Sequence, residues 1–240
     1  MIAARVSAWA IACAALVAAC ASSPRVPVLS SATTPAAAGL IDIRTLLPDI
    51  VEDIRYAGRD NFVGTPIDGY LAPRCYLLRP AAEALQHVEL ALRRDHLRLK
   101  IWDCYRPVRA VRQFVRWAND TSDQRTKATH YPNLDKRALL GDYIAPVSGH
   151  SRGATVDLTL LQCLGPEHAC IPLDMGTDFD FFDPLAHTDS PRATPAQHAN
   201  RVRLRAAMME QGFANYAQEW WHYTLSAEPT PQTIHDAPVQ

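Results

Sequence analysis

Two short segments of the chain carry residues that could together bind a metal ion. The first is Ser-Gly-His-Ser-Arg-Gly-Ala-Thr-Val-Asp at residues 148–157, and the second is Glu-Trp-Trp-His-Tyr at residues 219–223. His150, Asp157 and His222 would supply two imidazoles and one carboxylate, which leaves a fourth position open for water, as hydrolytic zinc sites require. The pattern therefore predicts one zinc ion that activates water.

Glu219 lies three residues before the last of these histidines and is a candidate proton acceptor. Two tryptophans and a tyrosine surround it, at positions 220, 221 and 223. Such neighbours would make a dry pocket, in which the pKa of a carboxyl group can rise toward the working range of a general base. The alternative is an aromatic core strand with incidental polar neighbours.

The chain must turn between His150 and Asp157 if both are to face one point. Residues seven apart on a straight strand point to opposite faces, and residues 151–153, Ser-Arg-Gly, can supply the turn. Asp157 lies in an apolar stretch, where a carboxylate is costly to bury unless it is paired or bound to metal. The alternative is a surface Asp157 on an exposed strand face and a loop histidine at position 150.

Arg106 is the third element of the predicted site. It lies in Asp-Cys-Tyr-Arg-Pro, residues 103–107, between the end of a predicted strand and the start of a helix. A guanidinium fixed there could hold a substrate carboxylate, or the oxyanion formed when water attacks a peptide carbonyl. The alternative is a structural salt bridge to Asp103.

The elements that must position these residues follow from the spacing of apolar and turn residues. Helices are expected to start at residues 79, 107 and 194, strands to cover 97–103, 154–160 and two short segments within 213–225, and irregular chain to cover 121–142 and 163–191. No regular β-α-β rhythm is visible. The pattern therefore predicts an α+β fold with an antiparallel sheet and flanking helices.

The start of the chain has the pattern of an export signal. Residues 8–19 form an unbroken apolar run after Arg5, too short to span a bilayer. The run ends in Val-Ala-Ala-Cys, which resembles the lipobox of bacterial lipoproteins. We therefore expect residues 1–19 to be a signal peptide and Cys20 to be lipidated. The alternative is an ordinary signal peptide cut at an Ala-x-Ala site.

Residues 20–39 are rich in Ala, Ser, Pro and Thr, a composition typical of a flexible tether. This division leaves residues 40–240 as one domain of a size that supports a real core. The formal net charge of −1 favours neither nucleic acid nor an anionic membrane surface as a partner.

Four cysteines remain after the predicted lipid site, an even number that suits an oxidising compartment. They allow three pairings, of which we favour Cys163–Cys170, because it closes a short loop, together with Cys75–Cys104. The alternative is four reduced, buried thiols. Zinc thiolates are less favoured because the chain has no C-x-x-C pair.

Taken together, the motifs at residues 103–107, 148–157 and 219–223 resemble those of the D-alanyl-D-alanine dipeptidases of the VanX type. These are zinc enzymes related in fold to D,D-carboxypeptidases and to the hedgehog signalling domain. The resemblance runs from about Asp53 to the C-terminus. It includes Tyr56, Asp60-Asn61-Phe62-x-Gly64 and Met175-Gly176-Thr177-x-Phe179-Asp180.

The resemblance implies a role for each residue of the site. His150, Asp157 and His222 would bind one zinc ion per chain. Glu219 would be the general base, and Arg106 would stabilise the tetrahedral intermediate.

The resemblance also implies a small pocket for the substrate. Tyr56, Ser148 and Asp180 would shape it, and Asp180 and Glu219 could pair with the ammonium group of a dipeptide. The partner is then a small dipeptide, the membrane is contacted only through the lipid anchor, and the oligomeric state stays open.

The expected function is zinc-dependent hydrolysis of D-alanyl-D-alanine and similar dipeptides in the periplasm, for scavenging or turnover of peptidoglycan dipeptides. Relatives tied to vancomycin resistance act on the cytoplasmic dipeptide pool, which an exported enzyme cannot reach. Two alternatives stay open: a zinc D,D-carboxypeptidase or endopeptidase that cleaves larger wall peptides, and a non-catalytic zinc-binding module.

Overall fold

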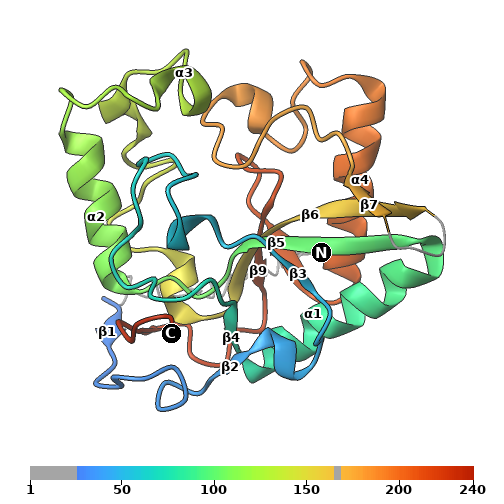
Figure 1. Ribbon diagram of the computed structural model, residues 1–240, viewed down its shortest axis with the longest axis horizontal. Coiled ribbons are helices and arrows are strands. Elements are labelled where there is room, and N and C mark those ends of the chain that lie inside the picture. Colours follow the sequence, from blue (N-terminus) through green and yellow to red (C-terminus); the bar gives the residue numbers. More distant parts are fainter. Residues whose placement is uncertain (1–25, 165–168) are drawn as a thin grey trace, which may run out of the picture.

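The computed structural model describes residues 26–164 and 169–240, and a six-stranded sheet lies at its centre (Figure 1). The sheet contains β3 (Val51–Glu52), β5 (Leu97–Asp103), β6 (Thr155–Leu164), β7 (Ala169–Pro172), β8 (Phe213–Asn215) and β9 (His222–Leu225). The strand order is β3-β5-β6-β9-β8, and β7 pairs with β6 outside this path. The long strands β5 and β6 therefore form the middle of the fold.

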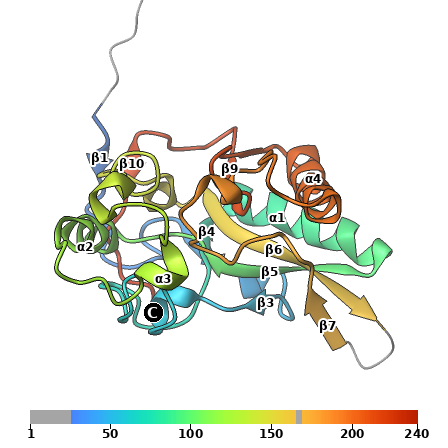
Figure 2. The same ribbon diagram turned by 90° about the horizontal axis from the view of Figure 1, so that it is seen from above.

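The helices are segregated to two parts of the molecule. They are α1 (Arg79–Leu92), α2 (Val108–Asn119), α3 (Lys127–His130) and α4 (Pro195–Glu210). Helices α1 and α4 lie together on one face of the sheet, whereas α2 and α3 stand beyond the ends of the strands (Figure 2). Short 3₁₀ helices occupy the connections: η1 (Ile43–Thr45), η2 (Arg55–Ala57), η3 (Arg93–Asp95), η4 (Lys136–Leu139), η5 (Gly149–Arg152) and η6 (Pro184–Ala186). The expected α+β fold is confirmed.

The three long helices start close to the predicted residues, for local reasons. Pro80 lies in the first turn of α1, where its missing N–H costs no hydrogen bond. At the start of α4 the Thr194 hydroxyl accepts from the Gln197 N–H, and the Gln197 side chain accepts from the Thr194 N–H at 2.9 Å. In β5, Leu97 and Leu99 are buried as the alternation predicts.

The sheet is mostly antiparallel, with one exception that corrects the expectation. Strand β3 pairs with β5 in parallel, with Val51 opposite Lys100 and Glu52 opposite Ile101. The connection between these strands contains α1, which returns the chain so that both strands can run in the same direction. A two-residue strand gives too little alternation for its direction to be read from the sequence.

The expectation of irregular chain over residues 163–191 was wrong for its first part. Strand β6 continues to Leu164, and β7 pairs with it so that Cys163 lies opposite Cys170. Pro, Gly and Asp residues recur at close intervals in this stretch of the sequence, but the ladder with β6 satisfies the backbone groups of β7.

The expected tether over residues 20–39 also needs a correction, because the folded part begins earlier. Strand β1 (Val28–Leu29) pairs in parallel with β10 (Thr233–Ile234), and Leu40 N–H donates to the Pro35 carbonyl at 2.9 Å. These pairings fix the chain well before residue 40. The predicted signal peptide and Cys20 lie outside the described residues.

A second small sheet pairs β2 (Leu40–Asp42) with β4 (Tyr76–Leu78) in antiparallel fashion. The structure contains two disulfides, Cys75–Cys104 and Cys163–Cys170, which is the pairing that the sequence favoured. Within the two described ranges, none of the helices combines the length and apolar character that a membrane span needs.

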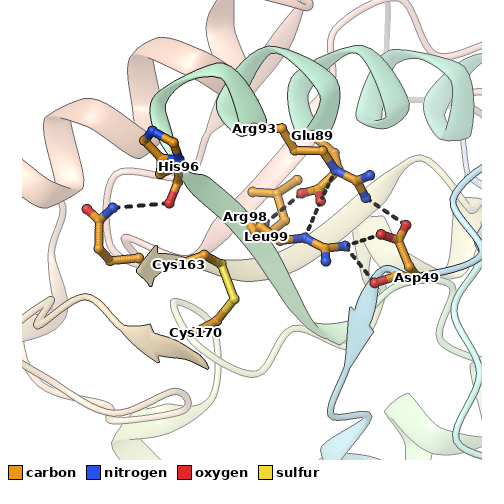
Figure 3. Close-up of a disulfide and its surroundings, with 9 residues drawn as sticks. Asp49, Glu89, Arg93, His96, Arg98, Leu99, Cys163 and Cys170 are labelled. Atoms are coloured by element: carbon orange, nitrogen blue, oxygen red, sulfur yellow. Dashed lines mark hydrogen bonds and ion pairs between the residues drawn. A yellow bond between two sulfur atoms is a disulfide. The ribbon is translucent and has the colours of Figure 1, made fainter. Parts of the chain in front are cut away.

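A buried carboxylate joins α1 to β5. Glu89 accepts from the Leu99 N–H at 2.7 Å and from the side chains of Arg93 and Arg98, each at 2.9 Å, and both arginines also reach Asp49 (Figure 3). A carboxylate with no exposed surface needs such partners. The cluster fixes the helix against the strand whose far end leads into the site.

Candidate active site

A pocket of about 250 Å³ lies where β5 ends and where β6 and β9 begin. Its lining contains every residue that the sequence assigned to the metal, the chemistry and the substrate: Tyr56, Arg106, Ser148, His150, Asp157, Asp180, Glu219 and His222. These residues come from five separate segments of the chain, and only the fold brings them together.

Strand register places two of the predicted metal ligands side by side. Asp157 on β6 lies directly opposite His222 on β9, so both side chains emerge on the same face of the sheet. His150 comes from η5, which the chain leaves through a left-handed turn at Gly153. A side chain at Gly153 would collide with Leu40, so both the turn and the close packing require glycine here.

The donor atoms of this set converge on one point. The Nε2 atom of His150 lies 3.2 Å from Nδ1 of His222 and 3.2 Å from Oδ2 of Asp157. The His222 Nδ1 atom lies 3.0 Å from Asp157 Oδ1, a buried oxygen without a well-directed hydrogen bond. One ligand atom from each residue lies within 4.8 Å of the others. Two imidazoles and a carboxylate at this spacing fit zinc.

The protonation pattern of His150 also suits a ligand. Its Nδ1 atom lies 2.7 Å from the Cys104 carbonyl oxygen, which can only accept, so Nδ1 carries the proton. The lone pair of Nε2 then faces Asp157 and His222. A backbone carbonyl behind a histidine commonly fixes the metal-binding tautomer in this way.

The charges of Asp157 and His222 agree with this arrangement. Burial by itself would raise the pKa of Asp157, but the adjacent His150 and His222 hold that pKa well below its usual value. Burial lowers the pKa of His222 despite its contact with Asp157. An ionised carboxylate and a neutral imidazole are the forms that bind a metal.

Glu219 lies beside this set and belongs to the same pocket. Its Oε2 atom is 3.5 Å from His222 Nδ1, and the residue is buried. Burial, with the nearby charges of Asp157 and Asp180, raises the pKa of Glu219 well above its usual value. The position and the raised pKa suit a group that accepts a proton and later returns it.

Arg106 makes the structural ion pair that its sequence position allowed, and it also lines the pocket. Its Nε atom donates to Asp103 Oδ2 at 2.9 Å, which is the structural ion pair. Its guanidinium also lies 3.5 Å from Asp157 Oδ2 and about 5 Å from the ring centres of Tyr56 and Phe114. The ion pair and the rings therefore hold a cation at the edge of the metal site.

The predicted substrate residues lie on the other side of the pocket. Tyr56 donates its hydroxyl to Asp180, with oxygen distances of 3.0 and 3.2 Å. Asp180 is buried in a left-handed backbone conformation with φ 57°, and burial raises its pKa well above the usual value. Ser148 accepts from the His150 N–H at 3.2 Å, which links this residue to η5.

Some residues of the pocket were missed from the sequence. Residues 141–145 and Val147 line it, although 121–142 was expected only to be irregular chain. Tyr216 holds this segment by donating its hydroxyl to the Asp142 carbonyl at 2.8 Å, and Tyr143 contacts His187 at 3.3 Å. No spacing or composition in this stretch indicates a pocket wall.

Asn215 was also missed. Its side-chain amide donates to the carbonyls of both Glu219 and His222, each at 3.0 Å. It therefore fixes the turn between β8 and β9 that carries the predicted base and one ligand. An asparagine near a tight turn is the only signal that could have indicated it.

Comparison with known proteins places this site in a known family. Residues 36–240 match the M15 peptidase family described as D-ala-D-ala dipeptidase. A D-alanyl-D-alanine dipeptidase of Streptomyces coelicolor is 45% identical over 195 residues, which are 81% of this chain and 95% of that protein. One of Enterococcus faecium is 39% identical over 201 residues, 82% of this chain and 98% of that protein.

Among solved structures, a variant of the vancomycin-resistance D,D-pentapeptidase VanY in complex with Zn(II) aligns with a TM-score of 0.39 and 14% identity. The alignment covers 68% of this chain and 79% of that chain.

Zinc should stabilise the folded protein through His222. We expect zinc at roughly 100 times its dissociation constant to raise the free energy of unfolding by about 2.7 kcal/mol relative to the metal-free protein. For a domain of this size that raises Tm by roughly 5–10 °C. The His222→Ala protein should lose this response. The matched control is His198→Ala, at an exposed histidine of α4, which should keep it. Differential scanning calorimetry makes the comparison; an equal shift in the His222→Ala protein would exclude this residue as a ligand.

Proposed function

The chain belongs to the M15 family of D-ala-D-ala dipeptidases, and we propose that it hydrolyses D-alanyl-D-alanine and similar dipeptides as a zinc enzyme. One observation carries the proposal: the donor atoms of His150, Asp157 and His222 converge beside buried Glu219 in a single pocket. These three residues would hold the zinc ion.

Glu219 is the residue that would move the proton. Zinc bound at the site would supply a water of lowered pKa and would polarise the scissile carbonyl. The Glu219 carboxylate lies close enough to His222 to reach a water on the open side of the ligand set. It would accept the proton of the attacking water and return it to the leaving amine. Because burial favours the protonated form of Glu219, the proton can remain on this carboxyl group until it passes to the leaving amine.

Arg106 would stabilise the oxyanion of the tetrahedral intermediate. Its guanidinium is held by Asp103 and stacked against the rings of Tyr56 and Phe114, so it needs little reorganisation during the reaction. Hydrogen-bond donors that are preorganised in a dry pocket stabilise the charge of the transition state much more than donors in water do. Because its Nη2 atom also reaches Asp157, the charge lies next to the metal position.

The other wall of the pocket would select a dipeptide. The buried Asp180 carboxylate, oriented by the Tyr56 hydroxyl that donates to it, would accept from a substrate ammonium group, and Ser148 lies near the ligand His150. The pocket, at about 250 Å³, is below the range of roughly 300–1,000 Å³ common for drug-sized ligands. A small pocket with a buried acid at one side favours a free dipeptide over a longer wall peptide.

Export and lipidation complete the proposal. The chain would be cut before Cys20, anchored through a lipid on that cysteine, and active in the periplasm on dipeptides released during peptidoglycan turnover. The supporting observations are the apolar run with its Val-Ala-Ala-Cys end, and two disulfides, which persist in oxidising compartments.

Replacing Glu219 should remove the chemistry and leave the metal bound. We expect Glu219→Gln to lower kcat for D-alanyl-D-alanine by roughly 10²–10⁴-fold, because a neutral amide cannot accept the proton. Zinc content, measured by atomic emission, should stay at the wild-type level. The matched control is Glu210→Gln, at an exposed position of α4, which should behave as wild type. Turnover of the Glu219→Gln protein near the wild-type rate would show that another group is the base.

A substrate panel tests the proposed function itself. The zinc-loaded protein should release D-alanine from D-alanyl-D-alanine, and a chelator should abolish the reaction. It should act poorly on D-alanyl-D-lactate and mixed-chirality dipeptides and leave a pentapeptide ending in D-alanyl-D-alanine intact. Preferred cleavage of the pentapeptide would instead indicate a carboxypeptidase or endopeptidase. A protein that binds zinc and cleaves none of these substrates would be a binding module.

The anchor is tested in cells. The full chain should fractionate with membranes and enter the detergent phase on extraction, whereas Cys20→Ala should be exported without the lipid or stay unprocessed. The matched control is Cys13→Ala, because that cysteine lies inside the predicted signal peptide and should have no effect. Recovery of the wild-type chain in the cytoplasm would contradict both export and lipidation.

A further inference from the structure

One of the two disulfides lies directly behind the candidate metal site. Cys104 follows the last residue of β5, and its carbonyl is the group that accepts from Nδ1 of His150 at 2.7 Å. Its sulfur is bonded to Cys75, and both cysteines are buried. Cys104 thus carries both the carbonyl that orients His150 and one sulfur of the disulfide.

The carbonyl needs a fixed position to orient the ring. A hydrogen bond behind a metal-bound histidine sets its tautomer and its direction, and losing such a partner typically costs 10–100-fold in metal affinity or activity. Strand β5 ends at Asp103, so Cys104 lies beyond the strand and its ladder with β6. The ladder with β6 therefore does not itself hold the Cys104 carbonyl.

Cys75 is well placed to provide that restraint. Its carbonyl accepts from the Ile43 N–H at 3.0 Å, and its own N–H donates to Glu52 at 3.3 Å. Next along the chain, the Tyr105 N–H donates to the Tyr76 carbonyl at 3.0 Å. The disulfide therefore ties Cys104 to a segment that is itself held by two neighbouring parts of the fold.

The same stretch of chain carries Arg106 and contacts η5. The Arg106 N–H donates to the His150 carbonyl at 3.3 Å, and the Arg106 side chain pairs with Asp103. A shift of Cys104 would move the backbone on which the metal ligand and the guanidinium both depend.

We propose that the Cys75–Cys104 disulfide is a positioning device for the metal site, which holds the Cys104 carbonyl against His150. Breaking it weakens zinc binding in a protein that is still folded, and so makes metal affinity sensitive to the redox state of the compartment. The inference rests on the proposed role of His150 as a zinc ligand.

The chain offers a matched control in its second disulfide. Cys163 and Cys170 pair across β6 and β7, beside the start of β5 and the cluster around Glu89 (Figure 3). Neither cysteine lines the pocket, in contrast to His150 and Arg106. Removing this bond takes away a cross-link without touching the site.

The experiment compares zinc affinity in two double variants. Metal-free wild-type protein, Cys75→Ala/Cys104→Ala and Cys163→Ala/Cys170→Ala are titrated with zinc against a chromophoric chelator, with no substrate present. The first pair of substitutions keeps the Cys104 carbonyl and removes only its restraint. We expect its zinc affinity to fall roughly 10–100-fold, and that of the control variant to stay within about twofold of wild type. Both variants should melt at lower temperature, so a merely structural role would not separate them.

Equal zinc affinity in the folded Cys75→Ala/Cys104→Ala protein and in wild type would overturn the proposal. If that variant does not fold, zinc-loaded wild type is partly reduced, alkylated under native conditions and examined by native mass spectrometry. Molecules alkylated at Cys75 and Cys104 should have lost zinc, and those alkylated only at Cys163 and Cys170 should retain it. Zinc retained in both populations would overturn the proposal as well.

Failure of the proposed function gives a different result. If wild-type protein binds no zinc in the titration, the metal site itself is disproved, and this inference with it. If wild type binds zinc and hydrolyses the dipeptide, but the Cys75→Ala/Cys104→Ala variant has the same zinc affinity, only this inference is disproved.

Discussion

Two buried carboxylates on adjacent central strands set the main constraint on this structure. Asp103 on β5 lies opposite Asp157 on β6, and neither is exposed. Carboxyl groups so close in a dry interior keep their charged forms only when cations or hydrogen-bond donors lie nearby. Arg106 meets part of this need because it contacts both carboxylates, at 2.9 and 3.5 Å, and a metal ion next to Asp157 would meet the rest. Arg106 and a bound metal ion would thus favour the charged forms of the two acids at this end of the central strands.

The aromatic residues around the pocket keep these charges in a low-dielectric environment. Trp102 stacks on Phe179 with ring centres 4.9 Å apart, and Trp220 donates its indole N–H to Thr177 at 2.7 Å. These contacts fix the loop that carries Asp180. Burial therefore serves two purposes here: it strengthens each ionic contact in the site, and it holds the substrate wall in one position.

Much of the site was predictable because residue type and local spacing carry it. His150, Asp157, Glu219 and His222 were identified by their chemistry, and helix α4 by its capping box. What local sequence does not show is pairing over distance. The register that sets Asp157 against His222, and the approach of residues 141–147 to the pocket, arise from contacts between segments far apart in the chain. Strand β1 was missed for the same reason, since two residues become a strand only when β10 lies beside them.

The wide spacing of the ligands has a consequence for the order of assembly. His150 and Asp157 are brought together by a local turn, but His222 joins them only when β9 has added to β6. An unfolded chain can hold no more than part of the ligand set, and binding free energy released at a complete site is also folding free energy. The complete donor set therefore exists only when β9 has paired with β6, so zinc bound there would favour the folded chain over the unfolded one.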